Sequence, residues 1–122
     1  MIVHFFIERK LYMKEIWNLI EKTMNENPTP IQNENVCYEF NLTGEDASMR
    51  QLILSDGKAT ISEDTSTKAD CKLTMSTKDF MKLLKGDLNS TTAFMFGKLK
   101  VDGSIGLALK LEGLLKEYKF VI

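Results

Sequence analysis

The segment from Ile105 to about Tyr118 constrains the fold most, because its apolar side chains occupy an unusually wide part of one predicted helix. At about 100° per residue, most of them gather on one arc of about 120°, while Ile105 and Leu109 form a second arc. Glu112 and Lys116 separate the two arcs. One face of a sheet cannot cover both, so an N-terminal helix, a partner chain or a bound lipid must cover the rest. The main arc consists of Leu107, Ala108, Leu111, Leu114, Leu115 and Tyr118.

The wider stretch from Ala69 to Leu115 carries more apolar side chains than a domain of 122 residues needs to close its own core. No good candidate for acid–base catalysis lies among these side chains. The combination predicts an apolar cavity that holds a ligand.

Charge and cysteine content exclude several classes of protein. The chain has 16 Lys and Arg against 17 Asp and Glu, so no overall field favours nucleic acid as a partner. Cys37 and Cys71 are the two cysteines, too few for a disulfide framework, which predicts reduced thiols in a cytoplasmic protein. The apolar opening, residues 1–7, lacks a basic leader, and no apolar run reaches the roughly 20 residues that span a bilayer.

Apolar residues at steps of three and four predict a first helix over Met13–Met24. Residues 1–12 form a lead-in for which three interpretations stay open: an ordered helix, a mobile tail, or an artefact of the choice of start site. We expect residues 13–122 to form a single domain. Alternation predicts strands over 36–42, 49–54, 58–62 and 71–76, with Asp56-Gly57 closing a hairpin. We expect the fourth strand to join the sheet as an antiparallel neighbour.

The remaining elements are predicted from their caps. Ser76 followed by Asp79 has the spacing of a capping box, and Gly86 ends the helix that follows. Asn89, Ser90 or Thr91 caps a short helix that ends at Gly97, and a fifth strand follows through Leu99 and Val101. Ser104 caps the last helix.

No residue pattern supports an enzyme, a cofactor or a metal site. The single histidine, His4, lies in the lead-in, so a histidine-based triad would have to form outside the folded core. The adjacent carboxylates Glu45 and Asp46, like those at 63 and 64, fall in polar connections where solvated turn residues are expected. The neighbours Cys71 and Lys72 point to opposite faces of a strand, so the lysine does not activate the thiol.

Lysines gather on one helix flank and on one strand face. Such lysines form a solvated surface in most proteins, and in others they contact anionic lipid headgroups or the phosphates of coenzyme A. Both interpretations stay open, and transient contact with a membrane surface belongs to the second. The lysines are Lys78, Lys82, Lys85, Lys98 and Lys100.

The block Lys68 to Leu115 resembles the C-terminal half of the sterol carrier protein type 2 domain, also called nonspecific lipid-transfer protein. Its strand ADCKLTMS, helix KDFMKLLKG, turn ST-A-F, strand GKLKV-x-G and helix IGLALKL occur in the order typical of that family. The resemblance implies an α+β fold with a five-stranded, largely antiparallel sheet covered on one face by helices. It also implies an apolar tunnel between the two layers.

Carried over from the family, the tunnel lining falls on the capped helix, the aromatic turn, the fifth strand and the last helix. Phe96 stands where eukaryotic members often have a glutamine, so a polar contact there is not expected. The predicted ligand-binding residues are Phe80, Leu84, Phe94, Met95, Phe96, Leu99, Val101, Ile105, Leu107, Ala108, Leu111 and Leu115.

The leading hypothesis is a protein that carries a fatty acid, a fatty acyl-CoA or a similar lipid in that tunnel, without a catalytic step. The alternative is an interaction module whose C-terminal helix docks a lipid-metabolising enzyme or forms a homodimer.

Overall fold

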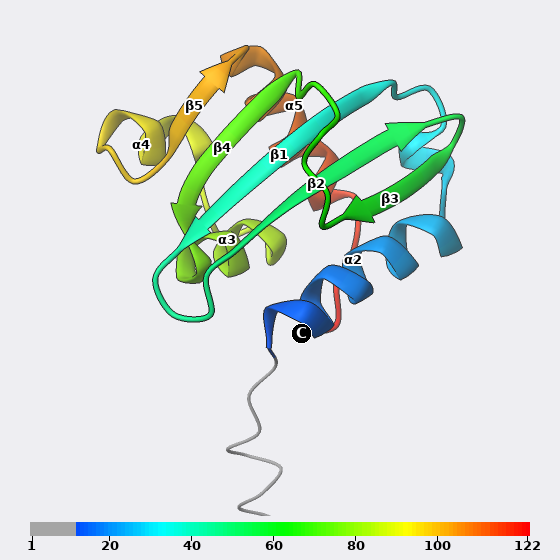
Figure 1. Cartoon of the computed structure of the whole chain (residues 1–122), viewed down its shortest axis with the longest axis horizontal. Coiled ribbons are helices and arrows are strands. Elements are labelled where there is room, and N and C mark those ends of the chain that lie inside the picture. The colour runs from blue at the N-terminus through cyan, green and yellow to red at the C-terminus, as the bar shows by residue number, and fades with distance from the viewer. Residues whose placement is uncertain (1–11) are drawn as a thin grey trace, which may run out of the picture.

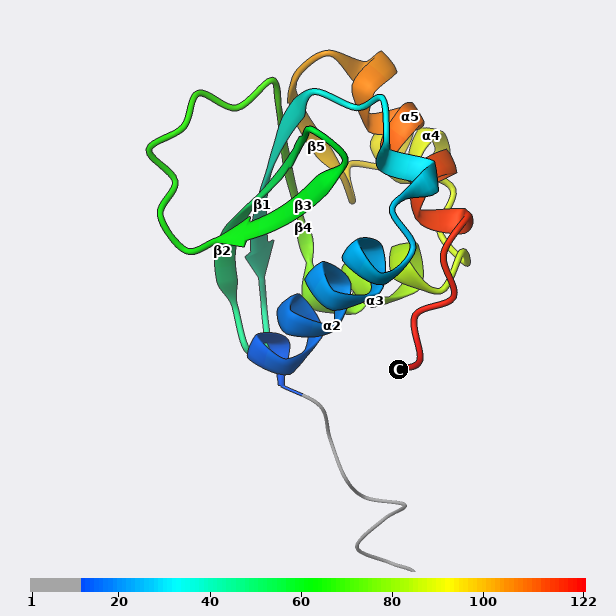
Figure 2. The ribbon, with the colours of Figure 1, turned by 90° about the vertical axis from the view of Figure 1, so that its right-hand side faces the viewer.

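The computed structural model describes residues 12–122, which form a five-stranded sheet with helices against one of its faces (Figures 1 and 2). The fold class predicted from the sequence is therefore confirmed. In chain order the elements are α2 (Met13–Glu26), the 3-10 turn η1 (Thr29–Ile31), β1 (Val36–Thr43), β2 (Ser48–Ser55), β3 (Lys58–Ser62), β4 (Cys71–Ser76), α3 (Thr77–Leu84), α4 (Ser90–Met95), β5 (Lys100–Gly103) and α5 (Ile105–Lys116).

The strand order is β3-β2-β1-β4-β5, and one of its pairings is parallel. β4 pairs with β1 in the parallel sense, so the expectation of an antiparallel fourth strand is wrong. The reason is the connection of residues 63–70, which swings out on the side away from the helices and returns the chain to the start of β1 (Figure 2). There Asp70 accepts a hydrogen bond from the Cys37 amide at 2.8 Å and donates its own amide to the Cys37 carbonyl at 2.8 Å.

The turns and caps predicted from the sequence are confirmed. Asp56 and Gly57 take φ values of 54° and 73°, as a tight hairpin requires. At each of the three helix starts for which a cap was predicted, a side-chain oxygen accepts a hydrogen bond from a first-turn amide. These pairs are Ser76 with Asp79 at 3.0 Å, Asn89 with Thr92 at 2.9 Å, and Ser104 with Leu107 at 3.3 Å.

The core lies between the sheet and the helices and contains a cluster of three aromatic rings. The rings of Trp17 from α2, Phe40 from β1 and Phe80 from α3 lie 5.0 to 5.7 Å apart, centroid to centroid. The hydroxyl of Tyr38, a fully buried residue on β1, donates a 2.9 Å hydrogen bond to the Leu107 carbonyl of α5. Sheet and last helix are therefore in direct contact at this point.

Within residues 12–122, no helix combines the length and the apolar character needed to cross a bilayer. The lead-in, apart from Tyr12, lies outside the described residues, and so does His4.

Candidate lipid-binding site

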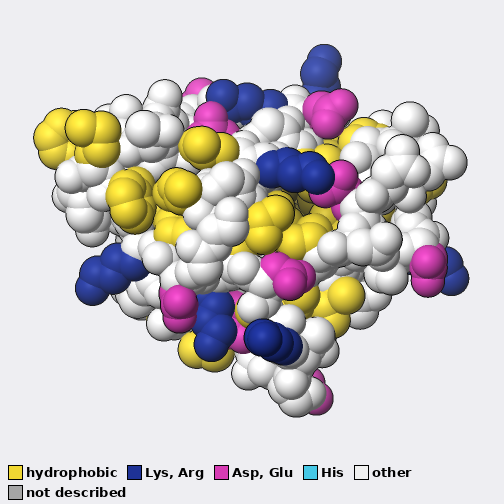
Figure 3. Space-filling view, turned by 90° about the horizontal axis from the view of Figure 1, so that it is seen from above, with side chains coloured by type: hydrophobic (Ala, Val, Ile, Leu, Met, Phe, Trp, Pro, Cys, Tyr) yellow, Lys and Arg dark blue, Asp and Glu magenta, His cyan; other side chains and the backbone are white. Residues whose placement is uncertain are grey.

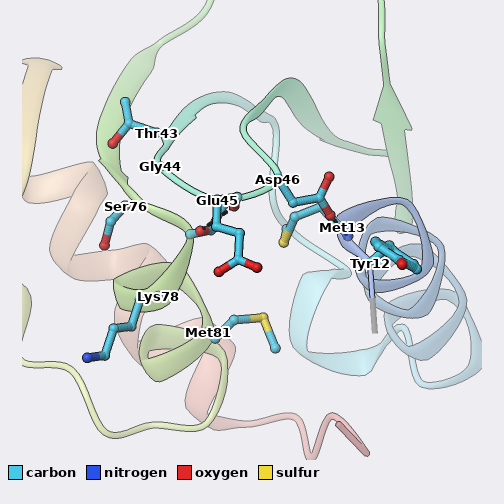
Figure 4. A pocket seen from close by; sticks show the side chains of 10 residues that line it. Tyr12, Met13, Thr43, Gly44, Glu45, Asp46, Ser76, Lys78 and Met81 are labelled. Atoms are coloured by element: carbon cyan, nitrogen blue, oxygen red, sulfur yellow. Dashed lines mark hydrogen bonds between the residues drawn. The ribbon is translucent and has the colours of Figure 1, made fainter. Parts of the chain in front are cut away.

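A pocket of about 740 Å³ lies at one end of the two layers, between the first turns of α2 and α3 and beside the turn that joins β1 to β2 (Figure 4). Its volume is within the range of roughly 300–1,000 Å³ that is usual for small-molecule sites. Three segments that are far apart in the sequence supply its walls. The lining residues are Tyr12, Met13, Thr43, Gly44, Glu45, Asp46, Ser76, Thr77, Lys78 and Met81.

Two methionines give the pocket its apolar floor. Met13 starts α2 and is 5% exposed, while Met81 of α3 is half-buried, and both side chains reach into the space between these helices (Figure 4). Met13 lies four residues before Trp17 on the same face of α2, and Met81 follows Phe80 directly. The floor is therefore next to the aromatic cluster of the core. Methionine is a flexible side chain that adapts to irregular apolar guests.

The polar rim is held in place by the turn of residues 43–46. Asp46, in the left-handed region at φ 56°, accepts a 2.6 Å hydrogen bond from the Met13 amide at the start of α2. The Thr77 hydroxyl of α3 donates to the Glu45 carbonyl at 2.8 Å. The same short turn therefore holds the first residues of both helices in place. In this way it sets the distance between the two helices at the pocket mouth.

The charge at this rim is mixed. Lys78 is the one cation among the lining residues, and it directs its ammonium group away from the pocket centre (Figure 4). The carboxylate of Glu45 points toward the space above Met81, and Asp46 adds a second negative charge. The lining residues therefore carry a formal charge of −1, which disfavours a ligand with several phosphates at this end.

A second pocket, about 450 Å³, lies at the opposite end of α3, where the chain leaves α5. Three of its lining side chains are the lysines Lys85, Lys116 and Lys119, although Lys116 is also paired with Glu112 at 3.1 Å. Its remaining lining residues are Leu84, Gly86, Tyr118 and Phe120. This pocket has the positive charge that the first one lacks.

The residues predicted to line a tunnel fall into three groups. Phe80, Leu84, Leu99, Ala108, Leu111 and Leu115 are buried core residues, exposed by 1–3%. Val101 and Leu107 are half-buried. Phe94, Met95, Phe96 and Ile105 are exposed, and only Leu84 of the whole set lines one of the two pockets described above. Their role in ligand binding stays a prediction.

Sequence reasoning did not find the pocket of Figure 4, although it singled out some of its residues. Glu45 and Asp46 are exposed turn residues, as expected, but they also form the rim. Ser76 was identified only as a cap. A usable signal was the pair Met13 and Met81, two adaptable apolar side chains near the starts of two helices, but only the packing of α2 beside α3 brings them together.

The ionisable groups buried near the sheet do not suit catalysis. Burial raises the pKa of both thiols, and the nearby carboxylate of Asp70 adds to the effect at Cys37 and Cys71. Both thiols therefore stay protonated and are weak nucleophiles. Burial likewise raises the pKa of the Tyr38 hydroxyl. In the part of the chain that the structure describes, no cluster of His, Cys, Asp and Glu is arranged to hold a metal ion.

Comparison with known proteins identifies several relatives. The model of the SCP-2 sterol transfer family matches residues 18–116. Hydroxysteroid dehydrogenase-like protein 2 of Xenopus tropicalis is 40% identical over 104 residues, which are 84% of this chain and 24% of that protein. The chain thus spans about a quarter of the length of this relative.

Solved structures share the fold. Sterol carrier protein 2 from Yarrowia lipolytica, in its apo form, superposes with a TM-score of 0.70 at 28% identity, covering 83% of this chain and 87% of that one. Sterol carrier protein 2 from Aedes aegypti, solved as a complex with the C16 fatty acid palmitate, gives a TM-score of 0.64 at 22% identity. That match covers 84% of this chain and 96% of the other.

Proposed function

The chain belongs to the SCP-2 sterol transfer family, and on that premise we propose that it binds a long-chain lipid, above all a fatty acid, and carries it through water. The observation that supports this proposal is the pocket of about 740 Å³ with its floor of Met13 and Met81, which adjoins the apolar core. A fatty acid would place its chain on this floor. Each methylene removed from water contributes about 0.8 kcal/mol to binding, less the costs of association.

The hydrocarbon chain of the lipid would extend from the pocket along the inner side of α3. Phe80 and Leu84 lie on that side of α3, and Leu111 and Leu115 of α5 belong to the same core cluster. These residues are buried in one core cluster, so a lipid that enters it would displace their side chains. The flexible methionine side chains at this end lose little packing energy when they rearrange. We therefore take this end as the point of entry for the lipid.

The charges at the rim select the polar end of the lipid. With Glu45 and Asp46 against Lys78, the rim suits a group that carries at most one negative charge. Lys78 is exposed and flexible enough to pair with a single carboxylate at the mouth. The phosphates of a coenzyme A ester would be repelled here and would need the lysines of the second pocket.

Displacement of a fluorescent fatty acid tests this proposal. We expect palmitic acid and the uncharged hexadecanol to compete, with palmitoyl-CoA weaker than both. Met81→Glu places a carboxylate on the apolar pocket floor and should weaken binding at least about tenfold, because burying an unpaired charge is costly. Met49→Glu is the matched control, since Met49 is 42% exposed and lies outside the pocket.

Met81→Trp separates ligand binding from folding, because it fills the pocket without adding charge. Both Met81 variants should bind less lipid than Met49→Glu while keeping the unfolding midpoint within the range of that control. Unchanged lipid binding in both variants would show that the ligand does not use this pocket.

One observation favours the alternative function, docking of a partner through the C-terminal helix. Ile105 and Leu109, the second arc of α5, are 42% and 44% exposed, so the described part of the chain does not cover them. Light scattering of the lipid-free protein distinguishes the two functions. A stable dimer that Leu109→Ser dissociates supports docking, whereas a monomer that binds the fluorescent fatty acid supports the carrier.

A further inference from the structure

Three consecutive large apolar side chains project into solvent at the end of α4. Phe94, Met95 and Phe96, called here the α4 patch, are 46%, 76% and 74% exposed. Hydrophobic side chains gather at the corresponding left end of the molecule in Figure 3. Single exposed apolar residues are common, but a contiguous group of this kind marks an interaction surface.

The α4 patch is exposed because hydrogen bonds fix the orientation of α4 on the rest of the fold. Ser90, 2% exposed, donates its amide to the Glu112 carboxylate of α5 at 2.7 Å. On the same side of the helix, the buried Ala93 accepts amide hydrogen bonds at its carbonyl from residues 98 and 99, at 2.8 and 3.1 Å. Turning the patch inward would break these bonds. The fold therefore holds the three side chains outward.

The surroundings of the patch are positively charged. Residues 90–101 contain Lys98 and Lys100 and no acidic residue. Both lysines are exposed, and neither forms an ion pair within residues 12–122. The acidic residues around the segment are Asp87 before it, Asp102 after it and Glu112, which is already bound to Ser90 and Lys116.

The apolar surface also extends toward α5. Glu112, which contacts α4, lies three residues after Leu109 and seven after Ile105, so all three share one flank of the helix. The two apolar members of this flank are exposed, as noted above.

From these features we propose that the α4 patch docks on the surface of an anionic lipid bilayer. The rings of Phe94 and Phe96 and the thioether of Met95 enter the interface, and Lys98 and Lys100 contact the lipid phosphates. A second copy of the chain fits this surface less well, because a two-fold interface would bring the lysines of both copies together. This proposal goes beyond the binding of a lipid in the pocket, because it concerns contact between the protein surface and the bilayers that donate and accept the lipid.

Flotation with lipid vesicles tests the proposal on the full chain. The vesicles are phosphatidylcholine alone and an equimolar mixture of phosphatidylcholine and phosphatidylglycerol. We expect binding to the mixed vesicles, weakened by added salt, and little binding to phosphatidylcholine alone. Lys98→Gln with Lys100→Gln should weaken binding to the mixed vesicles about 25-fold, at about fivefold per lysine. Lys58→Gln with Lys72→Gln is the control pair, exposed on other strands.

The apolar contribution is tested by Met95→Ser with Phe96→Ser, which should weaken binding at least about tenfold. Met49→Ser controls for the loss of one exposed apolar side chain elsewhere. Displacement of the fluorescent fatty acid should be unchanged in Lys98→Gln with Lys100→Gln, because neither lysine lines a pocket described above, so docking and lipid carriage can fail separately.

Three results would overturn the proposal. The first is no binding of the wild-type chain to mixed vesicles. The second is equal binding by the patch variants and their controls. The third is a wild-type dimer that Met95→Ser with Phe96→Ser dissociates, which would make the patch a contact between copies.

Discussion

Replacing Glu112 by Ala should detach α4 from α5 and lower the stability of the protein by about 2–3 kcal/mol. Glu112 accepts the Ser90 amide at 2.7 Å with one carboxylate oxygen and pairs with the Lys116 ammonium at 3.1 Å with the other. A hydrogen bond to a charged group contributes about 1.5–3 kcal/mol, more than an exposed i,i+4 ion pair at about 0.3–0.5 kcal/mol. Most of the loss therefore comes from the buried amide of Ser90.

The pKa of Glu112 gives this contact a pH dependence. Burial acts to raise that pKa, but the hydrogen bonds from Ser90 and the nearby Lys116 outweigh it, so the pKa lies below its ordinary value of 4.5. The unfolded chain takes up a proton first as the pH falls, so the contribution is present above pH 4.5 and is lost below it. The difference between wild type and Glu112→Ala should shrink accordingly in acid.

Urea unfolding and native-state hydrogen exchange measure these effects. We expect the Ser90 amide to exchange roughly 30-fold faster in Glu112→Ala, as about 2 kcal/mol implies. Lys116→Ala removes the ion pair alone, and Glu117→Ala removes an exposed carboxylate next to it on the chain; both should have small effects. If Glu112→Ala were no less stable than Glu117→Ala, the anchoring of α4 through Ser90 would be refuted.

Two other predictions concern the sheet. Tyr38→Phe should cost about 1 kcal/mol by removing the hydrogen bond to the Leu107 carbonyl. Burial raises the pKa of Tyr38 above 10.0, so the unfolded chain ionises first and the stability of the protein falls as the pH rises above that value. Urea unfolding at pH values on either side of 10.0 should show a smaller loss of stability for Tyr38→Phe than for the wild type. An equal loss in both proteins would contradict this prediction. Gly103→Ala should cost about 2 kcal/mol or more in the same assay, because φ is +112° and the new Cβ would lie 2.7 Å from the Asp70 carbonyl oxygen. Gly113→Ala, with open space around it in α5, should instead stabilise by about 0.5–1 kcal/mol, and equal effects of the two glycine changes would be inconsistent with the structure.

Features that depend on neighbours in the chain could be predicted from the sequence. The hairpin at Asp56-Gly57 and the caps at Ser76, Asn89 and Ser104 follow from backbone conformations and hydrogen bonds within a few residues. Within the main arc, Ala108, Leu111, Leu114 and Leu115 of α5 are likewise buried as the periodicity predicts, whereas Leu107 is half-buried. The order of motifs in residues 68–115 also indicated the family that the comparison with known proteins shows.

The exposure of the aromatic turn could not be predicted in this way. Phe94, Met95 and Phe96 are as apolar as core residues, and α4 has only six residues, too few to show a periodic face. The direction of these side chains depends on two hydrogen-bonded residues of α4. Ser90 is bound to Glu112 of α5, and Ala93 is bound to residues 98 and 99, which follow α4. The apolar composition of the segment indicates that its burial is favourable. It does not indicate whether the segment packs in the protein's own core or against another surface.

The sequence by itself determined the elements, their caps and the surplus of apolar side chains, because each of these follows from local geometry and from residue chemistry. Only the tertiary structure decided that β4 runs parallel to β1, that Met13 and Met81 face each other across a pocket, and that the α4 patch points outward. These properties depend on contacts between segments separated by twenty or more residues, such as Asp70 with Cys37, Asp46 with Met13 and Ser90 with Glu112. Such contacts are selected by the packing of the whole chain, which no local pattern contains.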